Sequence, residues 1–507
     1  MANVPAVRLG AAGQPRKFRA EGNAVLNPDP SRTLAQENSM TNHTAWRRSC
    51  IVCIAVLLSA AVAIPLPAQT FRTLMNFNVT NGSQPASSLV QGMDGEFYGT
   101  TFYGGNITAC GDGCGTIFKI TSGGSLRTLH EFDGTDGAGP GAVIQATDGH
   151  LYGTTGFEGA NTYGTVFKIS LSGTLSTLYN LEYSDGFDAV APLVQATNGN
   201  LYGTAYDGGA SAYPGYGTIF EITRAGAPTT LFSFSVASPN GSNPAAGLVQ
   251  AVDGNLYGTT AYVGVSLAGT VFKITPGGTL TTLHSFAFTD GANPFGGLIQ
   301  ATDGNFYGTT EDFGANGDGT VFRMTPDGTL TTLHSFDYTD GARIYAGLIQ
   351  ATDGDFYGTT EAGGADGYGT IFKITPTGKL KTLHSFDSTD GANPTGGLVQ
   401  GTDGNLYGTT SGGGAHAGGT VFKLSVGLGP FVNTLPASGK VGTAIEILGT
   451  DLTGATGVTF NGAAAAFTVV SPSLITTTVP AGATTGKVQV TTPGGTLLSN
   501  VTFRVRP

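Results

Sequence analysis

Oxygen ligands for a hard cation gather in one glycine-rich segment of the chain. Asp312, Asn316 and Asp318 stand close together, directly before Gly319. Carboxylate and amide oxygens are the ligands that Ca²⁺ takes in proteins. The spacing differs from that of an EF-hand loop, so a solvated acidic turn is the alternative. A calcium site at Asp312, Asn316 and Asp318 is therefore a hypothesis, and no other cofactor is indicated.

A second set of residues could bind sugar rings. Aromatic side chains offer flat apolar faces for stacking, and neighbouring acids accept hydrogen bonds from hydroxyl groups. The glycine-rich segments contain six such rings and two acids at Tyr103, Tyr206, Tyr213, Tyr216, Tyr262, Phe313, Glu361 and Asp366. These residues predict a carbohydrate-binding surface. The alternative is that several of the rings only pack within the fold.

Histidine and cysteine residues suggest structural roles. His130, His284, His334 and His384 occupy one position of a repeated unit, so they would be spread over separate units and could not share a metal. Cys110 and Cys114 are too few for a closed zinc site. In an oxidising compartment a disulfide between them is the expected state.

No catalytic constellation stands out. The sequence lacks a nucleophile elbow, an HExxH motif and a phosphate-binding loop, so no catalytic residue is assigned. Hydrolysis of a glycosidic bond needs only two carboxylates about 5 to 10 Å apart, and acids are plentiful. We interpret the chain as a binding or structural protein for extracellular carbohydrate or protein. A glycan hydrolase that uses carboxylates is the alternative.

Internal repeats must position these residues. Three landmarks each occur seven times: Tyr-Gly-Thr, Gly-Thr-(Ile/Val)-Phe, and a glutamine that ends a short apolar run. Tyr-Gly-Thr begins at Tyr98, Tyr152, Tyr202, Tyr257, Tyr307, Tyr357 and Tyr407. Units of about 50 residues are typical of propeller blades.

Each unit divides into four short strands. In the fifth unit the expected strands are 297–301, 306–310, 320–324 and 330–336, and Asp303-Gly304 predicts a two-residue hairpin turn with positive φ at both positions. The last unit lacks its fourth strand, and residues 73–77 match the missing one. We therefore predict a seven-bladed β-propeller over residues 71–427, closed by its N-terminal strand.

The two faces of such a ring differ in sequence. We call the face with the loops between second and third strands, and between successive units, the top face. The face with the short turns between first and second strands, and between third and fourth strands, is the bottom face. Because the bottom turns are nearly uniform and the top loops vary, binding is expected on the top face.

The repeats resemble a known family. Kelch and WD repeats have similar lengths but use tryptophan, and the single Trp46 precedes the repeats. The patterns D-G-x-(Phe/Leu)-Y-G-T and G-T-(Val/Ile)-F-K-I resemble the GloVer tandem repeat of bacterial "choice-of-anchor" exported proteins, over residues 71 to 425. The resemblance implies a propeller-like fold and implies no particular chemistry.

The C-terminal residues form a different module. From Pro430 the composition shifts to Thr, Val and Ala, and six short strands are expected at 444–448, 457–460, 465–469, 475–479, 487–491 and 501–505. Such strands suggest a small sandwich. The pattern Ile445-x-Ile447-x-Gly449 and Val458-x-Phe460-x-Gly462 resembles the IPT/TIG family of immunoglobulin-like domains, over residues 430–507.

The N-terminal residues predict export. An apolar run at 51–64 follows Arg47 and Arg48 and precedes a cleavage site near Ala68, which is the order of a signal peptide, here residues 40–68. Residues 1–39 are read as a disordered extension or a mis-assigned start. The mature protein is expected to be periplasmic, at the cell surface or secreted, monomeric and without a membrane span.

The charge balance argues against some partners. Residues 1–68 hold 7 of the 23 basic residues and 3 of the 34 acidic residues, so the remaining chain has a net charge of −15. A surface of this sign disfavours nucleic acid and anionic membranes.

Overall fold

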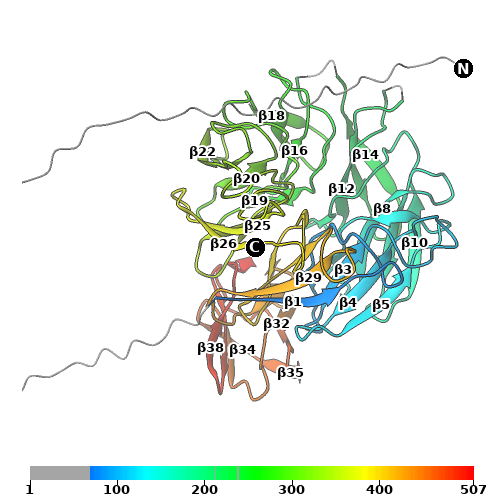
Figure 1. The fold of residues 1–507 in the computed structure, drawn as a ribbon. Coiled ribbons are helices and arrows are strands. Elements are labelled where there is room, and N and C mark those ends of the chain that lie inside the picture. The colour runs from blue at the N-terminus through cyan, green and yellow to red at the C-terminus, as the bar shows by residue number, and fades with distance from the viewer. Residues whose placement is uncertain (1–68, 212, 237–238, 507) are drawn as a thin grey trace, which may run out of the picture. The chain divides into compact units, whose positions relative to one another are not determined.

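The computed structural model describes residues 69–211, 213–236 and 239–506. All regular secondary structure in these residues is β-strand (Figure 1). The predicted all-β fold is confirmed. The predicted extension at 1–39 and signal peptide at 40–68 lie outside the described residues.

Seven antiparallel sheets follow one another between Thr70 and Ser425 of the described residues. We number them along the chain. Sheet 1 contains β2 to β5, sheet 2 contains β6 to β10, and sheets 3 to 6 contain β11 to β14, β15 to β18, β19 to β22 and β23 to β26. Sheet 7 combines β27, β28 and β29 with the N-terminal β1.

Each sheet repeats the same four positions. The first strands are β2 (Val90–Gln91), β7 (Ile144–Gln145), β11 (Val194–Gln195), β15 (Val249–Gln250), β19 (Ile299–Gln300), β23 (Ile349–Gln350) and β27 (Val399–Gln400). The second strands are β3 (Phe97–Thr101), β8 (Leu151–Phe157), β12 (Leu201–Ala205), β16 (Leu256–Thr260), β20 (Phe306–Thr310), β24 (Phe356–Thr360) and β28 (Leu406–Thr410).

The third strands are β4 (Thr116–Ile120), β9 (Thr165–Ile169), β13 (Thr218–Ile222), β17 (Thr270–Ile274), β21 (Thr320–Met324), β25 (Thr370–Ile374) and β29 (Thr420–Ser425). The fourth strands are β5 (Leu126–Glu131), β10 (Leu175–Asn180), β14 (Pro228–Ser233), β18 (Leu280–Ser285), β22 (Leu330–Ser335), β26 (Leu380–Ser385) and β1 (Thr70–Asn76). Sheet 2 has one further strand, β6 (Ala138–Pro140), which pairs with β8.

The bounds agree closely with those expected in the fifth unit. β20 and β21 begin and end where predicted, whereas β19 is only two residues long. The expected hairpin geometry at Asp303-Gly304 is wrong. Only Gly304 has positive φ, at 85°. Ala301 N–H donates to the carbonyl of Asn305, and Gly304 N–H donates to the carbonyl of Ala301, both at 2.9 Å. The loop is therefore three residues long, with the glycine in the left-handed position that such loops need.

The Tyr-Gly-Thr tripeptide joins neighbouring sheets, as sheet 5 illustrates. The Tyr307 hydroxyl donates to Asp303 Oδ2 at 2.9 Å, and its buried ring stacks on Phe356 of sheet 6 at 4.0 Å. A Cβ on Gly308 would stand 2.5 Å from Phe322 Cζ, so only glycine fits there. Thr309 Oγ1 donates to the carbonyl of Ala346 in sheet 6 at 2.9 Å. Each residue of the tripeptide therefore makes a contact that explains its identity.

The seven repeated glutamines form a ring of hydrogen bonds. Each side-chain Oε1 accepts from a backbone N–H in the bottom turn of the preceding sheet, at 2.8 to 3.0 Å. In six repeats the amide nitrogen also donates to the glycine carbonyl of its own turn. Gln91 of sheet 1 accepts from Thr402 of sheet 7, so the ring closes.

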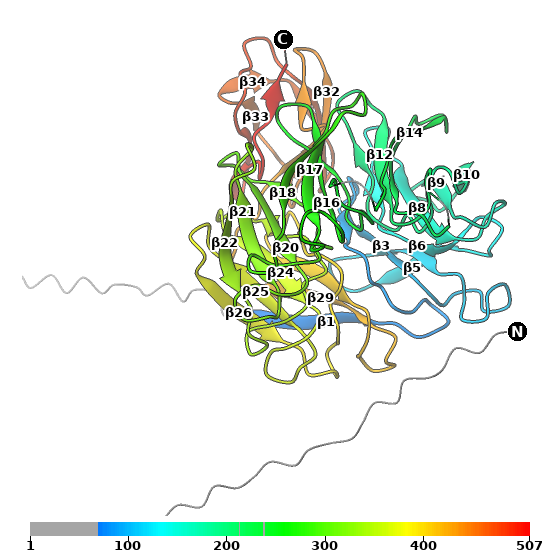
Figure 2. The same ribbon diagram turned by 90° about the horizontal axis from the view of Figure 1, so that it is seen from above.

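The predicted closing strand is confirmed. β1 pairs antiparallel with β29 from Thr70↔Ser425 to Asn76↔Thr420, although its bounds differ slightly from those expected. In Figures 1 and 2 the blue β1 runs beside the orange β29. Phe77 is fully buried against Phe118 of sheet 1, with ring centroids 5.1 Å apart. The N-terminal strand therefore fastens the first sheet to the last.

The C-terminal module has its own core and sheets. Its strands are β30 (Asn433–Leu435), β31 (Ser438–Gly439), β32 (Ala444–Leu448), β33 (Gly457–Phe460), β34 (Ala463–Ala465), β35 (Phe467–Ser471), β36 (Leu474–Thr478), β37 (Val488–Thr492), β38 (Gly495–Leu498) and β39 (Arg504–Val505). One sheet has the order β30-β32-β36-β35 and the other β34-β33-β37-β38. Ile447, Phe460 and Val490 are among the buried residues between them.

Predicted bounds are correct for β32 and β33. The expected strand 465–469 is instead divided between β34 and β35, and β38 was not predicted because Gly494-Gly495 reads as a turn.

Candidate functional site

One position of the repeat points to the centre of the ring in all seven sheets. Two residues before it, the chain has a φ between 54° and 61°, which turns the backbone into the first strand of the next sheet. Together with other residues, this position lines a central cavity of about 420 Å³. Its occupants are Ala86, Gly141, Val190, Ala245, Phe295, Tyr345 and Thr395.

Large side chains at this position occur only in two successive repeats. Phe295 and Tyr345 have ring centroids 5.5 Å apart with an interplanar angle of 49°. Packing of the central strands does not require them, because the equivalent residues elsewhere are Ala, Gly, Val or Thr. The pair therefore departs from what the scaffold needs.

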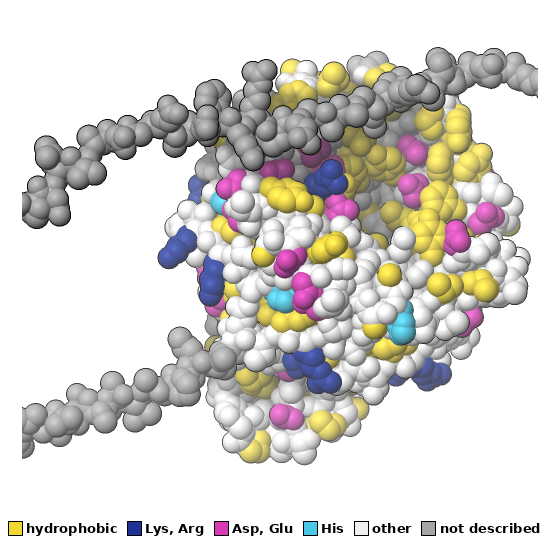
Figure 3. Space-filling view, in the orientation of Figure 1, with side chains coloured by type: hydrophobic (Ala, Val, Ile, Leu, Met, Phe, Trp, Pro, Cys, Tyr) yellow, Lys and Arg dark blue, Asp and Glu magenta, His cyan; other side chains and the backbone are white. Residues whose placement is uncertain are grey.

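A second cavity of about 430 Å³ lies where the centre meets the top loops, and we call it the channel mouth. It shares Phe295 and Tyr345 with the central cavity and adds Asp188, Tyr206 and Glu361. Figure 3 shows a hollow on this face with hydrophobic and acidic side chains around it. A cavity of this size with a few polar groups among apolar walls is typical of small-ligand sites.

Hydrogen bonds hold the aromatic side of the mouth. The Tyr345 hydroxyl donates to Glu311 Oε1, and burial together with this bond raises the pKa of Tyr345. Tyr262 packs edge-on against Phe295, with centroids 6.0 Å apart, and makes a hydrogen bond with Tyr206. Burial, followed by that bond, raises the pKa of Tyr206. Four rings thus form a connected wall.

The carboxylates of the mouth are poorly compensated. Burial raises the pKa of Asp188 to about 6, and repulsion from Asp207 adds to this. Burial also raises the pKa of Glu361, against the opposing charge of Arg343. Arg343 is largely exposed and its Nη1 stands 3.9 Å from Glu361 Oε2, which is buried and accepts no hydrogen bond. The mouth therefore carries negative charge that little in the protein offsets.

The structure separates the predicted sugar-binding residues. Tyr206 and Glu361 line the mouth, and Tyr262 contacts it through Phe295. Tyr216 instead packs on the apolar core between sheets. Phe313 packs on Phe288 with centroids 4.7 Å apart.

The other predicted residues do not line the mouth. Tyr103 packs on Phe102, with centroids 4.9 Å apart. Tyr213 is 77% exposed and stacks on Phe187, in a cluster that includes Tyr183. Asp366 is an exposed loop residue. These side chains do not form one surface with the mouth.

The hypothesised calcium ligands have other environments. Asn316 Nδ2 donates to the carbonyl of Ser335 at 2.8 Å. Burial, and then the nearby Asp318, raise the pKa of Asp312, although Arg343 opposes the shift. Across residues 69–211, 213–236 and 239–506, no group of three His, Cys, Asp or Glu side chains is arranged to hold a metal ion.

The repeated histidines each have a carboxylate partner. His130, His284, His334 and His384 lie 2.6 to 2.8 Å from Asp136, Asp290, Asp340 and Asp390 of the following top loop. Tyr179 replaces histidine in sheet 2 and donates to Asp185 at 2.8 Å. The interaction therefore fixes the top loop to the fourth strand in these repeats.

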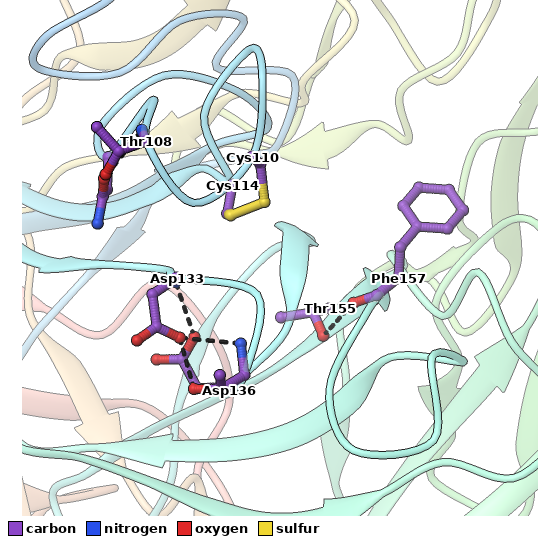
Figure 4. Close-up of a disulfide and its surroundings, with 9 residues drawn as sticks. Thr108, Cys110, Cys114, Asp133, Asp136, Thr155 and Phe157 are labelled. Atoms are coloured by element: carbon purple, nitrogen blue, oxygen red, sulfur yellow. Dashed lines mark hydrogen bonds between the residues drawn. A yellow bond between two sulfur atoms is a disulfide. The ribbon is translucent and has the colours of Figure 1, made fainter.

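A disulfide joins Cys110 and Cys114 in the top loop of sheet 1 (Figure 4). A Cβ on Gly134 would stand 3.8 and 3.9 Å from the two sulfurs, so the bridge packs against the next loop. In that loop Asp133 N donates to Asp136 Oδ1 at 3.1 Å. The bridge therefore pins a glycine-rich loop onto an ordered turn.

Three of the acidic and aromatic residues that line the mouth were absent from the predicted set: Asp188, Phe295 and Tyr345. They lie in the loops between successive units, where no candidate binding residue was predicted. Alignment of the seven repeats at the position of Phe295 would have revealed two aromatic exceptions.

Comparison with known proteins agrees with this architecture. The Gloeobacter/Verrucomicrobia repeat matches residues 60–261, 108–304 and 247–466. The chain belongs to this repeat family. An IPT/TIG domain matches residues 430–505, which confirms the second resemblance. No curated protein matches the chain.

Solved structures of similar fold share little sequence with this member of the Gloeobacter/Verrucomicrobia repeat family. A fungal alcohol oxidase in complex with copper is 14% identical, covers 86% of this chain and 99% of its own, and has a TM-score of 0.52. The extracellular domain of a hybrid two-component system from Bacteroides thetaiotaomicron is 14% identical, covers 85% of this chain and 54% of its own, and has a TM-score of 0.48. The likeness to the alcohol oxidase extends to the fold alone.

A search for membrane-spanning helices within the described part of the chain finds none of sufficient length and hydropathy.

Proposed function

We propose that this protein is a secreted binding module that holds an extracellular carbohydrate at the channel mouth. The observation that carries the proposal is the pair Phe295 and Tyr345. These are the two large side chains at a position where five other repeats place small or medium ones. Residues that the scaffold does not require are the best candidates for function on a repeated fold.

The chemistry of the mouth suits a sugar ring. Aromatic faces pack on the apolar faces of sugars, and polar groups at the edge orient the hydroxyls. Phe295 and Tyr345 offer the former, whereas Tyr206, Asp188 and Glu361 offer the latter. A site on a rigid ring needs little ordering on binding, which favours affinity.

Export is the second part of the proposal. The predicted signal peptide precedes the repeats, and the Cys110–Cys114 disulfide fits an oxidising compartment. N-terminal sequencing of the protein recovered outside the cytoplasm tests this part. A mature N-terminus near Gln69 is expected, and retention of residues 1–68 on the exported protein would contradict it.

A glycan hydrolase is the second candidate. One observation favours it: Asp188, with its pKa raised to about 6, shares a cavity with the carboxylate of Glu361. A raised carboxyl pKa is what a general acid needs near neutral pH.

A glycan array probed with the exported protein tests binding. A Phe295→Ala/Tyr345→Ala double variant should lose the captured glycan. The matched control Phe288→Ala/Phe313→Ala removes another pair of top-face rings in contact, and it should retain binding. Equal binding by the first variant would refute the site. Shortened glycan products would favour the hydrolase.

A further inference from the structure

The channel mouth differs from the rest of the molecule in how its acids are compensated. On the bottom face Lys168, Lys373 and Lys423 lie 3.3, 2.8 and 3.0 Å from turn carboxylates. At the mouth the basic side chain nearest Glu361 is Arg343, at 3.9 Å and mostly exposed. An ion pair at this distance, with an arginine that is mostly in solvent, contributes little.

Two carboxylates, those of Glu361 and Asp188, line the cavity of the channel mouth. Glu361 Oε2 is buried without a hydrogen-bond donor. Asp188 has no hydrogen bond to its carboxylate among the described residues, and its main neighbour of charge is the like-charged Asp207. A buried carboxylate without partners is costly, so a ligand that carries positive charge would relieve the cost.

The residues that line the channel mouth suit an organic ammonium group better than a metal ion. A metal ion requires several ligand atoms at short range, and within the described residues no three His, Cys, Asp or Glu side chains at the mouth are arranged to hold one. An organic ammonium group needs only a carboxylate partner, and it also gains from aromatic faces such as those of Phe295 and Tyr345.

We propose that the carbohydrate held at the channel mouth is an amino sugar with a free ammonium group, which pairs with Asp188 and Glu361 while its ring packs on Phe295 and Tyr345. This inference rests on the proposed function and narrows it to one substrate class. Neutral and acidic sugars would leave both carboxylates uncompensated, and acidic sugars would also be repelled.

Isothermal titration of the exported full-length protein tests the inference with three probes of equal length. These are the β-1,4-linked tetramer of glucosamine, the same tetramer fully N-acetylated, and the β-1,4-linked tetramer of glucose. Removing the ammonium charge should weaken binding by about ten-fold or more, the usual consequence of losing a charge-assisted hydrogen bond.

Variants locate the effect. Glu361→Gln and Asp188→Asn keep the shape of each side chain and should each reduce the preference for the glucosamine tetramer by about ten-fold. Asp366→Asn is the matched control, because Asp366 is an exposed acid in the same top loop as Glu361. It should leave the preference unchanged.

The outcomes separate the two proposals. Equal affinity for all three probes, lost in Phe295→Ala/Tyr345→Ala, would overturn the amino-sugar inference and leave the carbohydrate site standing. A preference for the glucosamine tetramer that survives Glu361→Gln and Asp188→Asn would also overturn the inference. Failure of any glycan to bind would refute the proposed function, and the inference with it.

Discussion

The pKa of a carboxylate in a bottom turn and the pKa values of the two carboxylates at the channel mouth are shifted in opposite directions. Burial raises the pKa of the bottom-turn Asp303, but hydrogen bonds from Asn305 and Tyr307 and the charge of Arg323 outweigh burial and lower it below its ordinary value. At the mouth, burial is not outweighed, and the pKa values of Asp188 and Glu361 are raised. The bottom face satisfies its charges within the fold, whereas the mouth leaves them open to a ligand.

The difference also appears in how repeats vary. Bottom-face residues such as Gln300, Asp303 and Tyr307 make contacts that recur in at least six of the seven repeats. At the mouth, the equivalents of Phe295 range from Gly141 to Tyr345. Uniform positions therefore stabilise the ring, and the variable position is where a function can be placed.

The largest expected effect compares two tyrosines. Tyr307→Ala removes a fully buried ring between sheets and should lower the free energy of unfolding by about 3 to 5 kcal/mol. Tyr345→Ala, at the partly open mouth, should cost less than half as much while abolishing binding. Chemical denaturation of both variants measures the contrast. Equal losses would mean that the mouth is as structural as the bottom face.

Loss of the disulfide should have an intermediate effect confined to the top face. Cys110→Ser/Cys114→Ser opens a very short loop, so the expected loss of stability is about 2 kcal/mol or less. Thermal unfolding of this variant should show the same number of transitions as the unchanged protein. An additional, early transition would show that sheet 1 depends on its top loop.

Neutralising one carboxylate on each face should give effects of opposite sign. Asp303→Asn loses charge-assisted hydrogen bonds and should destabilise the protein by about 1 kcal/mol. Asp188→Asn removes a buried, uncompensated charge and should stabilise it by about 1 kcal/mol at pH 7. Midpoints of urea denaturation measure both. If Asp188→Asn destabilised the protein instead, the Asp188 carboxylate would have to be stabilised by a hydrogen-bond donor or a positive charge at the mouth, which would contradict the account.

The smallest effect is a pH dependence of stability. The lowered pKa of Asp303 contributes stability that is present above its ordinary value of 3.8 and is lost as the pH falls through the lowered value. The raised pKa of Asp188 acts in the opposite sense, since stability is gained as the pH falls from about 6 towards 3.8. Asp188→Asn should remove that gain between pH 6 and pH 4 in a denaturation series. Asp366→Asn serves as the control and should retain it.

Sequence patterns predicted the fold more completely than the site. Strands β20 and β21, the pairing of β1 with β29 and the C-terminal module all follow from local patterns that recur along the chain. The mouth depends on residues from separate repeats that meet only when the ring closes. Tyr206 and Glu361 were found because their residue types suggest sugar binding. Phe295 was not, because its loop reads as an ordinary turn.

The most direct test of a ligand site at the channel mouth uses the absence of tryptophan after residue 46. Tyr345→Trp would place the single tryptophan of the exported protein at the mouth, and Phe313→Trp would place it on the top face away from the mouth. Titration with the glycan selected on the array should change the emission of Tyr345→Trp in a saturable manner and leave Phe313→Trp unchanged. A response in Phe313→Trp alone, or in neither variant while the glycan binds, would contradict the account.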